Sequence, residues 1–142
     1  MELDDRMLAF LEKQSATVMT TLKSDGTPHS VRVASASVDG KIWSSGTATR
    51  VRTRHLRRDP RCALIVLDQG AGHLSLETTV TIHDGPDAPE LNVRYFRLVQ
   101  KRPTGPLSWL NDELDEAAFR KAMVDEQRLI YEFEVHRAFG IY

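Results

Sequence analysis

The sequence has few of the features that support a disulfide-bonded, metal-binding or membrane protein. It contains one cysteine, Cys62, in 142 residues, which excludes a disulfide framework and a thiolate metal cluster. Cys62 lies in an apolar run, where a buried small side chain is the favoured interpretation. No apolar run approaches the roughly 18 residues that span a bilayer. The N-terminus is acidic where a signal peptide is basic, so we expect a cytoplasmic protein that does not enter the membrane.

Signatures of the common catalytic sites are also missing. The five histidines have no paired ligand spacing, so we expect no metal site. The sequence has neither a Gly-x-Gly-x-x-Gly turn nor a Walker-type phosphate loop. Serines, histidines and acids are present, but no three of them stand out as a triad. A chain without catalytic machinery of its own favours chemistry that a bound cofactor carries out.

Length and composition predict one globular domain over residues 1–142, with 41% apolar and 27% charged residues. Hydrophobic alternation and turn signals predict six strands, at 17–22, 30–38, 41–44, 61–68, 74–82 and 129–135. Helical spacing predicts helices at 3–14, 91–101 and 112–125, with a fourth over the arginine-rich segment and a loop at 84–89. Because most strands are joined without an intervening helix, an antiparallel barrel-like sheet is expected rather than a doubly wound one.

Positive charge is concentrated in one segment of the chain. Residues 50–61 contain six arginines, although the formal net charge of the whole chain is −1. A nucleic-acid partner is not favoured, because the pI is near 6.5 and no helix-turn-helix or RNA-binding motif is present. The aromatic residues are also not interleaved with the basic ones. The local cluster therefore points to a small anionic ligand.

A helix over this segment, ended by Asp59-Pro60, divides the arginines between two faces. At about 100° per residue, Arg52 points about 200° away from Arg50, beside His55 and Leu56 on the only face with apolar residues. An inward arginine needs an anionic partner, because an unpaired buried charge is costly. The remaining arginines of the helix form a solvated stripe: Arg54, Arg57 and Arg58.

Two interpretations account for Arg52 and the hydroxyl groups that precede it. In the first, Arg50 in the first turn and Arg52 form a phosphate cradle, because free N–H groups and the helix dipole favour an anion there. Four hydroxyl donors come just before: Ser44, Ser45, Thr47 and Thr49. In the second, Thr47 or Thr49 is a plain N-cap and Arg52 pairs with a buried carboxylate. These residues alone leave both interpretations open.

Three motifs together resemble a known family. They are Gly26-Thr-Pro-His-Ser-Val-Arg-Val33, Asp39-Gly-Lys-Ile-Trp-Ser-Ser45 and Arg50-x-Arg52-x-x-x-Leu-Arg-Arg-Asp-Pro-Arg61. Their combination resembles the pyridoxamine 5′-phosphate oxidase-like split β-barrel proteins, and more narrowly the actinobacterial branch that uses the deazaflavin coenzyme F420. The resemblance covers most of the chain and is weakest between Thr78 and Asn111.

The resemblance implies a mainly β (β + α) split β-barrel with about six antiparallel strands and three to four short helices. It also implies a homodimer with the cofactor site between the protomers. The phosphate-binding basic residue of the family falls on Arg52, with Arg50 and Ser45 beside it, and the strand at 30–33 would pass along the ring system. The whole predicted cofactor-binding set is Ser30, Val31, Arg32, Val33, Ser44, Ser45, Thr47, Thr49, Arg50, Arg52 and His55. No catalytic side chain is predicted.

The implied function is that of an oxidoreductase that binds reduced coenzyme F420 and transfers a hydride to a small, electron-poor organic substrate. Two alternatives stay open. An FMN-dependent relative of pyridoxamine-phosphate oxidase would use the same phosphate cradle. A non-enzymatic flavin- or haem-binding carrier or sensor would account for the missing catalytic side chains.

Overall fold

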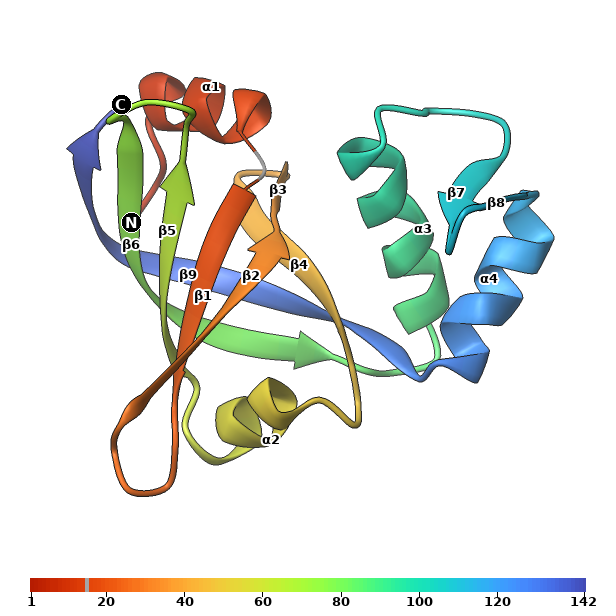
Figure 1. The fold of residues 1–142 in the computed structure, drawn as a ribbon, viewed down its shortest axis with the longest axis horizontal. Helices are drawn as coiled ribbons and strands as arrows, with labels where there is room; N and C mark the ends of the chain where they lie inside the picture. The colour runs from red at the N-terminus through yellow and green to blue at the C-terminus, as the bar shows by residue number, and fades with distance from the viewer. Residues whose placement is uncertain (15) are drawn as a thin grey trace.

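A computed structural model describes residues 1–14 and 16–142, which form a curled antiparallel sheet flanked by helices (Figure 1). In chain order the elements are α1 (Asp5–Lys13), β1 (Ala16–Leu22), β2 (Pro28–Ala34), β3 (Ala36–Val38), β4 (Lys41–Thr47), α2 (Val51–Arg58), β5 (Arg61–Leu67), β6 (His73–His83), α3 (Ala88–Val99), β7 (Leu107–Trp109), β8 (Asp112–Leu114), α4 (Glu116–Asp125) and β9 (Arg128–Ile141). Seven strands form one sheet in the order β2-β1-β5-β6-β9-β4-β3, and β7 and β8 form a separate hairpin. The sheet curls into a half-barrel, which confirms the predicted mainly β split-barrel class.

The curl of the sheet brings its two ends towards each other. The long strand β6 pairs with β9 from Ile130 to Ile141, with a register shift between Glu77 and Thr78. Such a bulge bends a strand and increases its twist. At the ends of the sheet, the Ser44 hydroxyl on β4 donates a hydrogen bond to the carbonyl of Ala34 on β2 at 2.7 Å. We call the gap between β2 and residues 44–47 of β4 the split.

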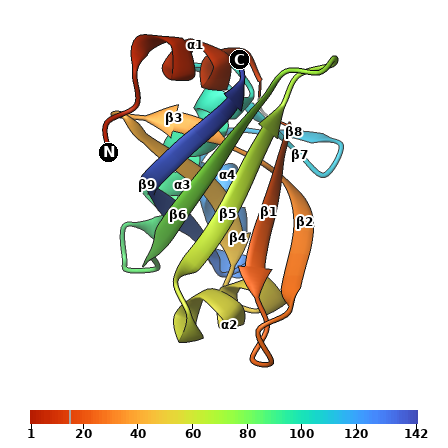
Figure 2. The same cartoon turned by 90° about the vertical axis from the view of Figure 1, so that its left-hand side faces the viewer.

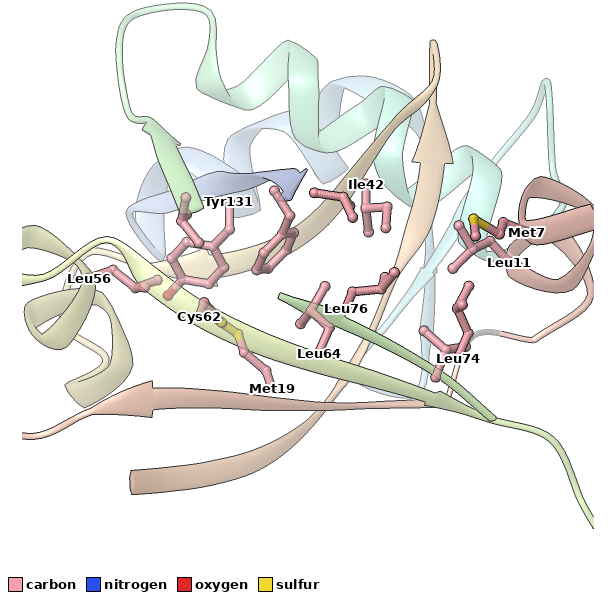
Figure 3. Close-up of a cluster of buried hydrophobic side chains, with 14 of the residues drawn as sticks. Met7, Leu11, Met19, Ile42, Leu56, Cys62, Leu64, Leu74, Leu76 and Tyr131 are labelled. Atoms are coloured by element: carbon pink, nitrogen blue, oxygen red, sulfur yellow. The ribbon is translucent and has the colours of Figure 1, made fainter. Parts of the chain in front are cut away.

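The main hydrophobic core fills the inside of the curled sheet (Figure 3). Helix α1 closes one end of this core with Met7 and Leu11, and helix α2 closes the other end with Leu56 (Figure 1). Each fully buried side chain of this size contributes about 1.5–3 kcal/mol. The burial of Leu56 therefore fixes α2, and with it the arginine-rich segment, against the end of the barrel.

Helices α3 and α4 and the β7–β8 hairpin gather on one side of the sheet (Figure 1). A small core joins them to each other through Val93, Leu107, Phe119 and Met123. A second small core, which includes Tyr95 and Ile130, attaches α3 to strands β4 and β9. Together these clusters hold Tyr95 close to one end of the split. No helix among residues 1–14 and 16–142 is long and apolar enough to cross a bilayer.

The described residues contain nine strands, not about six, and the predicted strand at 30–38 is one source of the difference. That strand is broken into β2 and β3 at Ser35, whose hydroxyl bonds to that of Thr17 at 2.6 Å. The last strand, predicted at 129–135, continues to Ile141 because β6 pairs with it from Ile130 to Ile141. The hairpin of β7 and β8 was not predicted at all.

Two helix boundaries also differ from the prediction. Helix α3 begins at Ala88, inside the loop predicted at 84–89, because Pro89 is accommodated in its first turn. Helix α4 begins at Glu116, four residues later than predicted. The carboxylate of Asp115 caps it by accepting a hydrogen bond from the Ala118 amide at 2.8 Å. Residues 112–114 before this cap belong to β8.

Candidate functional site

The split has an open backbone edge on each side. Strand β2 is an edge of the sheet and pairs only with β1. Strand β3 pairs with β4 only as far as Trp43, so the following residues of β4 have a strand partner only on the β9 side. Unpaired backbone N–H and C=O groups need hydrogen-bond partners. Along the split, such groups lack a strand partner on one side.

One end of the split is closed by hydrogen bonds to a single carbonyl. The Ala34 carbonyl accepts one bond from the Ser44 hydroxyl and another from the Tyr95 hydroxyl, at 2.7 and 2.8 Å. Burial raises the pKa of Tyr95 to about 12, so this phenol stays a neutral donor at physiological pH. Strand β2 and helix α3 are thereby joined across the end of the split that lies away from α2.

Arg52 is the distinctive residue at the α2 end. It is half-buried, and its Nε is buried without a hydrogen-bond partner among the described residues. No carboxylate of residues 1–14 and 16–142 forms an ion pair with it. Burial lowers the pKa of the Arg52 guanidinium, attraction to Tyr131 opposes this, and the charge of Arg50 lowers it further. A bound anion would supply the missing counter-charge.

The start of α2 lacks the threonine N-cap of the second interpretation. Arg50 is the N-cap, one residue before the helix, and not a residue of its first turn as predicted. It makes no side-chain capping bond, and Thr47 and Thr49 bond to each other through their hydroxyls at 3.2 Å. The amides of the first turn of a helix have no intrahelical acceptor. The alternative of a threonine N-cap with a carboxylate beside Arg52 is therefore not what the described residues form.

The predicted hydroxyl donors of β4 point in different directions. The Ser44 hydroxyl is used at the closed end of the split. The Ser45 hydroxyl donates to Oδ1 of Asn92 at 2.5 Å, and Asn92 in turn donates to the Ala88 carbonyl at 3.0 Å. The side chain of Ser45 therefore faces α3. Thr47 and Thr49 are the hydroxyl residues that lie next to the start of α2.

The predicted strand residues of β2 alternate between two faces of the sheet. Val31 and Val33 pack against the main core, whereas Ser30 and Arg32 are exposed on the outer face. The Ser30 hydroxyl bonds to that of Thr20 on β1 at 2.8 Å. The free backbone edge of this strand, at the residues predicted to pass along the ring system, faces away from β1.

His55 makes its contacts with β1 and β2. It is buried, its Nδ1 lies 2.8 Å from the Thr21 hydroxyl, and its ring meets that of His29 edge to face at 5.1 Å. Burial lowers the pKa of His55, and the nearby His29 and Arg58 lower it further. A neutral His55 thus anchors α2 to the sheet.

Three residues at the site were missed by the sequence analysis: Tyr95, Arg128 and Tyr131. Arg128 stands opposite Thr47 on β9, and its charge contributes to the lowered pKa of Arg52. It is itself paired with Glu126 at 3.1 Å. These residues lie far along the chain from the arginine-rich segment, inside elements whose periodicity indicates only core packing, so no local signal marks them.

Cys62 is a buried free cysteine. Burial raises the pKa of the Cys62 thiol to about 12, which makes it unreactive at neutral pH. Within residues 1–14 and 16–142, no group of three or more histidine, cysteine or acidic side chains is placed to hold a metal ion.

The sequence and the fold are similar to those of known proteins. The model of the family described as pyridoxamine 5′-phosphate oxidase matches residues 3–139. A conserved hypothetical protein from Mycobacterium tuberculosis is 26% identical, with 99% of this chain and 85% of that chain covered and a TM-score of 0.75. An F420 reductase is 18% identical over 96% of this chain and 98% of that chain, with a TM-score of 0.70. A haem-binding protein from Mycobacterium smegmatis is 13% identical over 99% of this chain and 55% of that chain, with a TM-score of 0.68. The last two likenesses show the fold alone.

Proposed function

The chain belongs to the pyridoxamine 5′-phosphate oxidase family, and from this premise we propose that it is an oxidoreductase that uses the deazaflavin coenzyme F420. The observation that carries the proposal is Arg52, which lies half-buried at the start of α2 with an unpaired Nε and no carboxylate partner among the described residues. A phosphate provides both the negative charge and the acceptor oxygens that such a guanidinium lacks.

In this proposal, groups around the split would hold a phosphorylated flavin or deazaflavin. Arg52 would bind the phosphate, and Arg50 and the first amides of α2 would add donors beside it. The backbone edge of β2 at residues 30–33 would face the polar edge of the ring system. When bound, the cofactor would supply the hydride chemistry, with a small electron-poor organic molecule as the acceptor. The chain itself would fix the position of the ring and exclude water.

The proposal includes a homodimer with the cofactor site between the protomers. The strands β1, β2, β5 and β6 lie side by side and present one broad outer face (Figure 2). This face has a hollow of about 430 Å³, whose lining includes Thr20, Ala63 and His136. Ser30 and Arg32 are exposed on the same outer side of β2. A second copy on this face would bring the mouth of the split close to the interface.

The second candidate is an FMN-dependent enzyme. The observation that favours it is again Arg52, because a guanidinium at this place recognises a phosphate group and not the ring attached to it. FMN carries a phosphate as well. The two candidates therefore differ in the ring that the split accepts.

Titration of the purified protein with coenzyme F420 and, separately, with FMN, followed by fluorescence, tests the proposal. We expect F420 to bind at micromolar or lower concentration and more tightly than FMN. A panel of electron-poor C=C, C=N and C=O acceptors then tests for oxidation of the reduced cofactor. Tight binding of FMN alone would favour the second candidate, and binding without any turnover would favour a carrier. Failure of both cofactors to bind at micromolar concentration would contradict the proposal.

A further inference from the structure

The Arg52 guanidinium lies near an aromatic ring and is not paired with a carboxylate of the described residues. Cζ of Arg52 lies 5.8 Å from the ring centroid of Tyr131, on strand β9. Tyr131 has no solvent-exposed surface and is part of the main core (Figure 3). The face of an aromatic ring attracts a guanidinium without neutralising it. Tyr131 can therefore hold Arg52 while its charge stays available.

The hydroxyl of Tyr131 has a defined hydrogen-bond direction. Thr53, on α2 next to Arg52, donates its single hydroxyl hydrogen to the Thr47 carbonyl at 2.7 Å. The Thr53 hydroxyl is also hydrogen-bonded to that of Tyr131. Because the hydrogen of Thr53 is already used, Tyr131 must be the donor in this second bond. The lone pairs of the Tyr131 oxygen then remain as acceptors towards the Arg52 guanidinium.

A glycine on the neighbouring strand makes room for this ring. A Cβ atom at Gly46 would lie 2.5 Å from Cε2 of Tyr131 and closer still to its Cζ and hydroxyl. Gly46 is not among the glycines with positive φ, so backbone conformation does not require glycine there. The close approach of the tyrosine is the physical reason for a glycine at this place. Tyr131 thus packs against Gly46, is hydrogen-bonded to Thr53 and places its ring beside Arg52. We call these three residues the arrangement under Arg52.

We propose that Tyr131 is a positioning residue for the anion site, which holds the Arg52 guanidinium at the split through its ring face and hydroxyl oxygen. An acidic residue in the same place would bind Arg52 just as firmly, but it would compete with the phosphate. The proposal rests on the proposed phosphate-binding role of Arg52. It adds that the affinity of the site depends on Tyr131 only when Arg52 is present.

A double-mutant cycle on cofactor affinity tests this dependence. Tyr131→Met removes the ring and largely refills its volume with a flexible side chain, and we expect it to weaken the binding of the tighter of F420 and FMN by about fivefold to thirtyfold. Tyr131→Phe keeps the ring face and is expected to stay within about threefold of the wild type. In the Arg52→Ala background, Tyr131→Met should change the affinity by less than about twofold.

Phe133→Leu is the matched control for the loss of an aromatic core residue. Phe133 lies two residues along β9, packs in the same core and is 1% exposed. We expect Phe133→Leu to lower the free energy of unfolding and to leave cofactor affinity within about twofold. An equal loss of affinity from Tyr131→Met with and without Arg52, or no loss from Tyr131→Met, would overturn the proposal. If instead Arg52→Ala itself leaves affinity unchanged, the phosphate site is wrong, and with it the proposed function.

A measurement on the wild type keeps the proposal testable if Tyr131→Met does not fold. Inorganic phosphate is titrated into the protein, with binding followed by calorimetry and the tyrosine absorption followed by difference spectroscopy. We expect a tyrosine difference spectrum that saturates with the calorimetric binding curve and disappears in Tyr131→Phe. Phosphate binding with the same tyrosine spectrum in Tyr131→Phe as in the wild type would overturn the role of Tyr131. No phosphate binding at all would count against the anion site itself.

Discussion

Substitution of Gly46 by alanine should destabilise the protein, although it adds only one methyl group. The new Cβ would lie 2.5 Å from Cε2 of Tyr131 and still closer to the phenol end of the ring. Tyr131 has no exposed surface, so the ring cannot move into solvent. It would have to push against the core or against the residues below α2.

Two effects of Gly46→Ala determine how much folding stability is lost. An extra methyl group forced into a packed core costs typically about 1–3 kcal/mol. Displacement of the Tyr131 hydroxyl from Thr53 loses a hydrogen bond worth about 1 kcal/mol. We therefore expect Gly46→Ala to lower the free energy of unfolding by about 2–4 kcal/mol. For a domain of this length the melting temperature should fall by roughly 5–15 °C.

Urea unfolding followed by circular dichroism measures this change. Gly70→Ala is the control, because a Cβ at Gly70 would meet its nearest neighbour, Oδ1 of Asp68, at an ordinary 3.6 Å. In the Tyr131→Phe background, Gly46→Ala should cost less, since the hydroxyl overlap is gone while the overlap with the ring carbons remains. If Gly46→Ala stays within about 0.5 kcal/mol of the wild type, as the control should, the arrangement under Arg52 is wrong.

Two further predictions concern buried titratable groups. Because burial raises the pKa of Cys62 to about 12, a thiol reagent at pH 8 should modify native protein only as fast as the protein unfolds, and rapid labelling would contradict the buried assignment. The pKa of His55 is lowered below its unfolded value of 6.5, so the unfolded state binds more protons. The stabilising contribution of neutral His55 is present above pH 6.5 and is lost as the pH falls through the folded pKa. Urea unfolding at several pH values should show this loss, and His55→Gln should flatten it; an unchanged pH slope in His55→Gln would argue against the assignment.

The fold was largely predictable because alternating burial along β1, β5 and β6 is a local property of the sequence. The β7–β8 hairpin was not. Its turn residues are Leu110 and Asn111, with φ of 50° and 69°. Two-residue hairpin turns with positive φ usually contain glycine, and leucine at such a position gives no turn signal. The preceding proline-rich stretch therefore looked like a simple break between helices.

Part of the site was predictable because the period of a helix is also a local property of the sequence. The helical period turns Arg52 towards the apolar face, and the structure places its Nε in a buried position. The residues that surround it depend on tertiary contacts. Tyr131 lies under Arg52 because β9 pairs with β4, and Asn92 on α3 draws the Ser45 hydroxyl away from the split. Neither contact follows from a local pattern.

The proposed function depends above all on Arg52 as the residue that holds the phosphate of a bound flavin or deazaflavin. The most direct test compares the affinity of Arg52→Ala and Arg54→Ala for coenzyme F420 and FMN by fluorescence titration. The two arginines lie two residues apart on α2, but Arg54 is exposed. We expect Arg52→Ala to weaken binding of the preferred cofactor by about tenfold to a hundredfold, as the loss of a charge-assisted hydrogen bond does. Arg54→Ala should stay within about twofold. Equal affinities of Arg52→Ala and the wild type for both cofactors would show that Arg52 does not bind the phosphate.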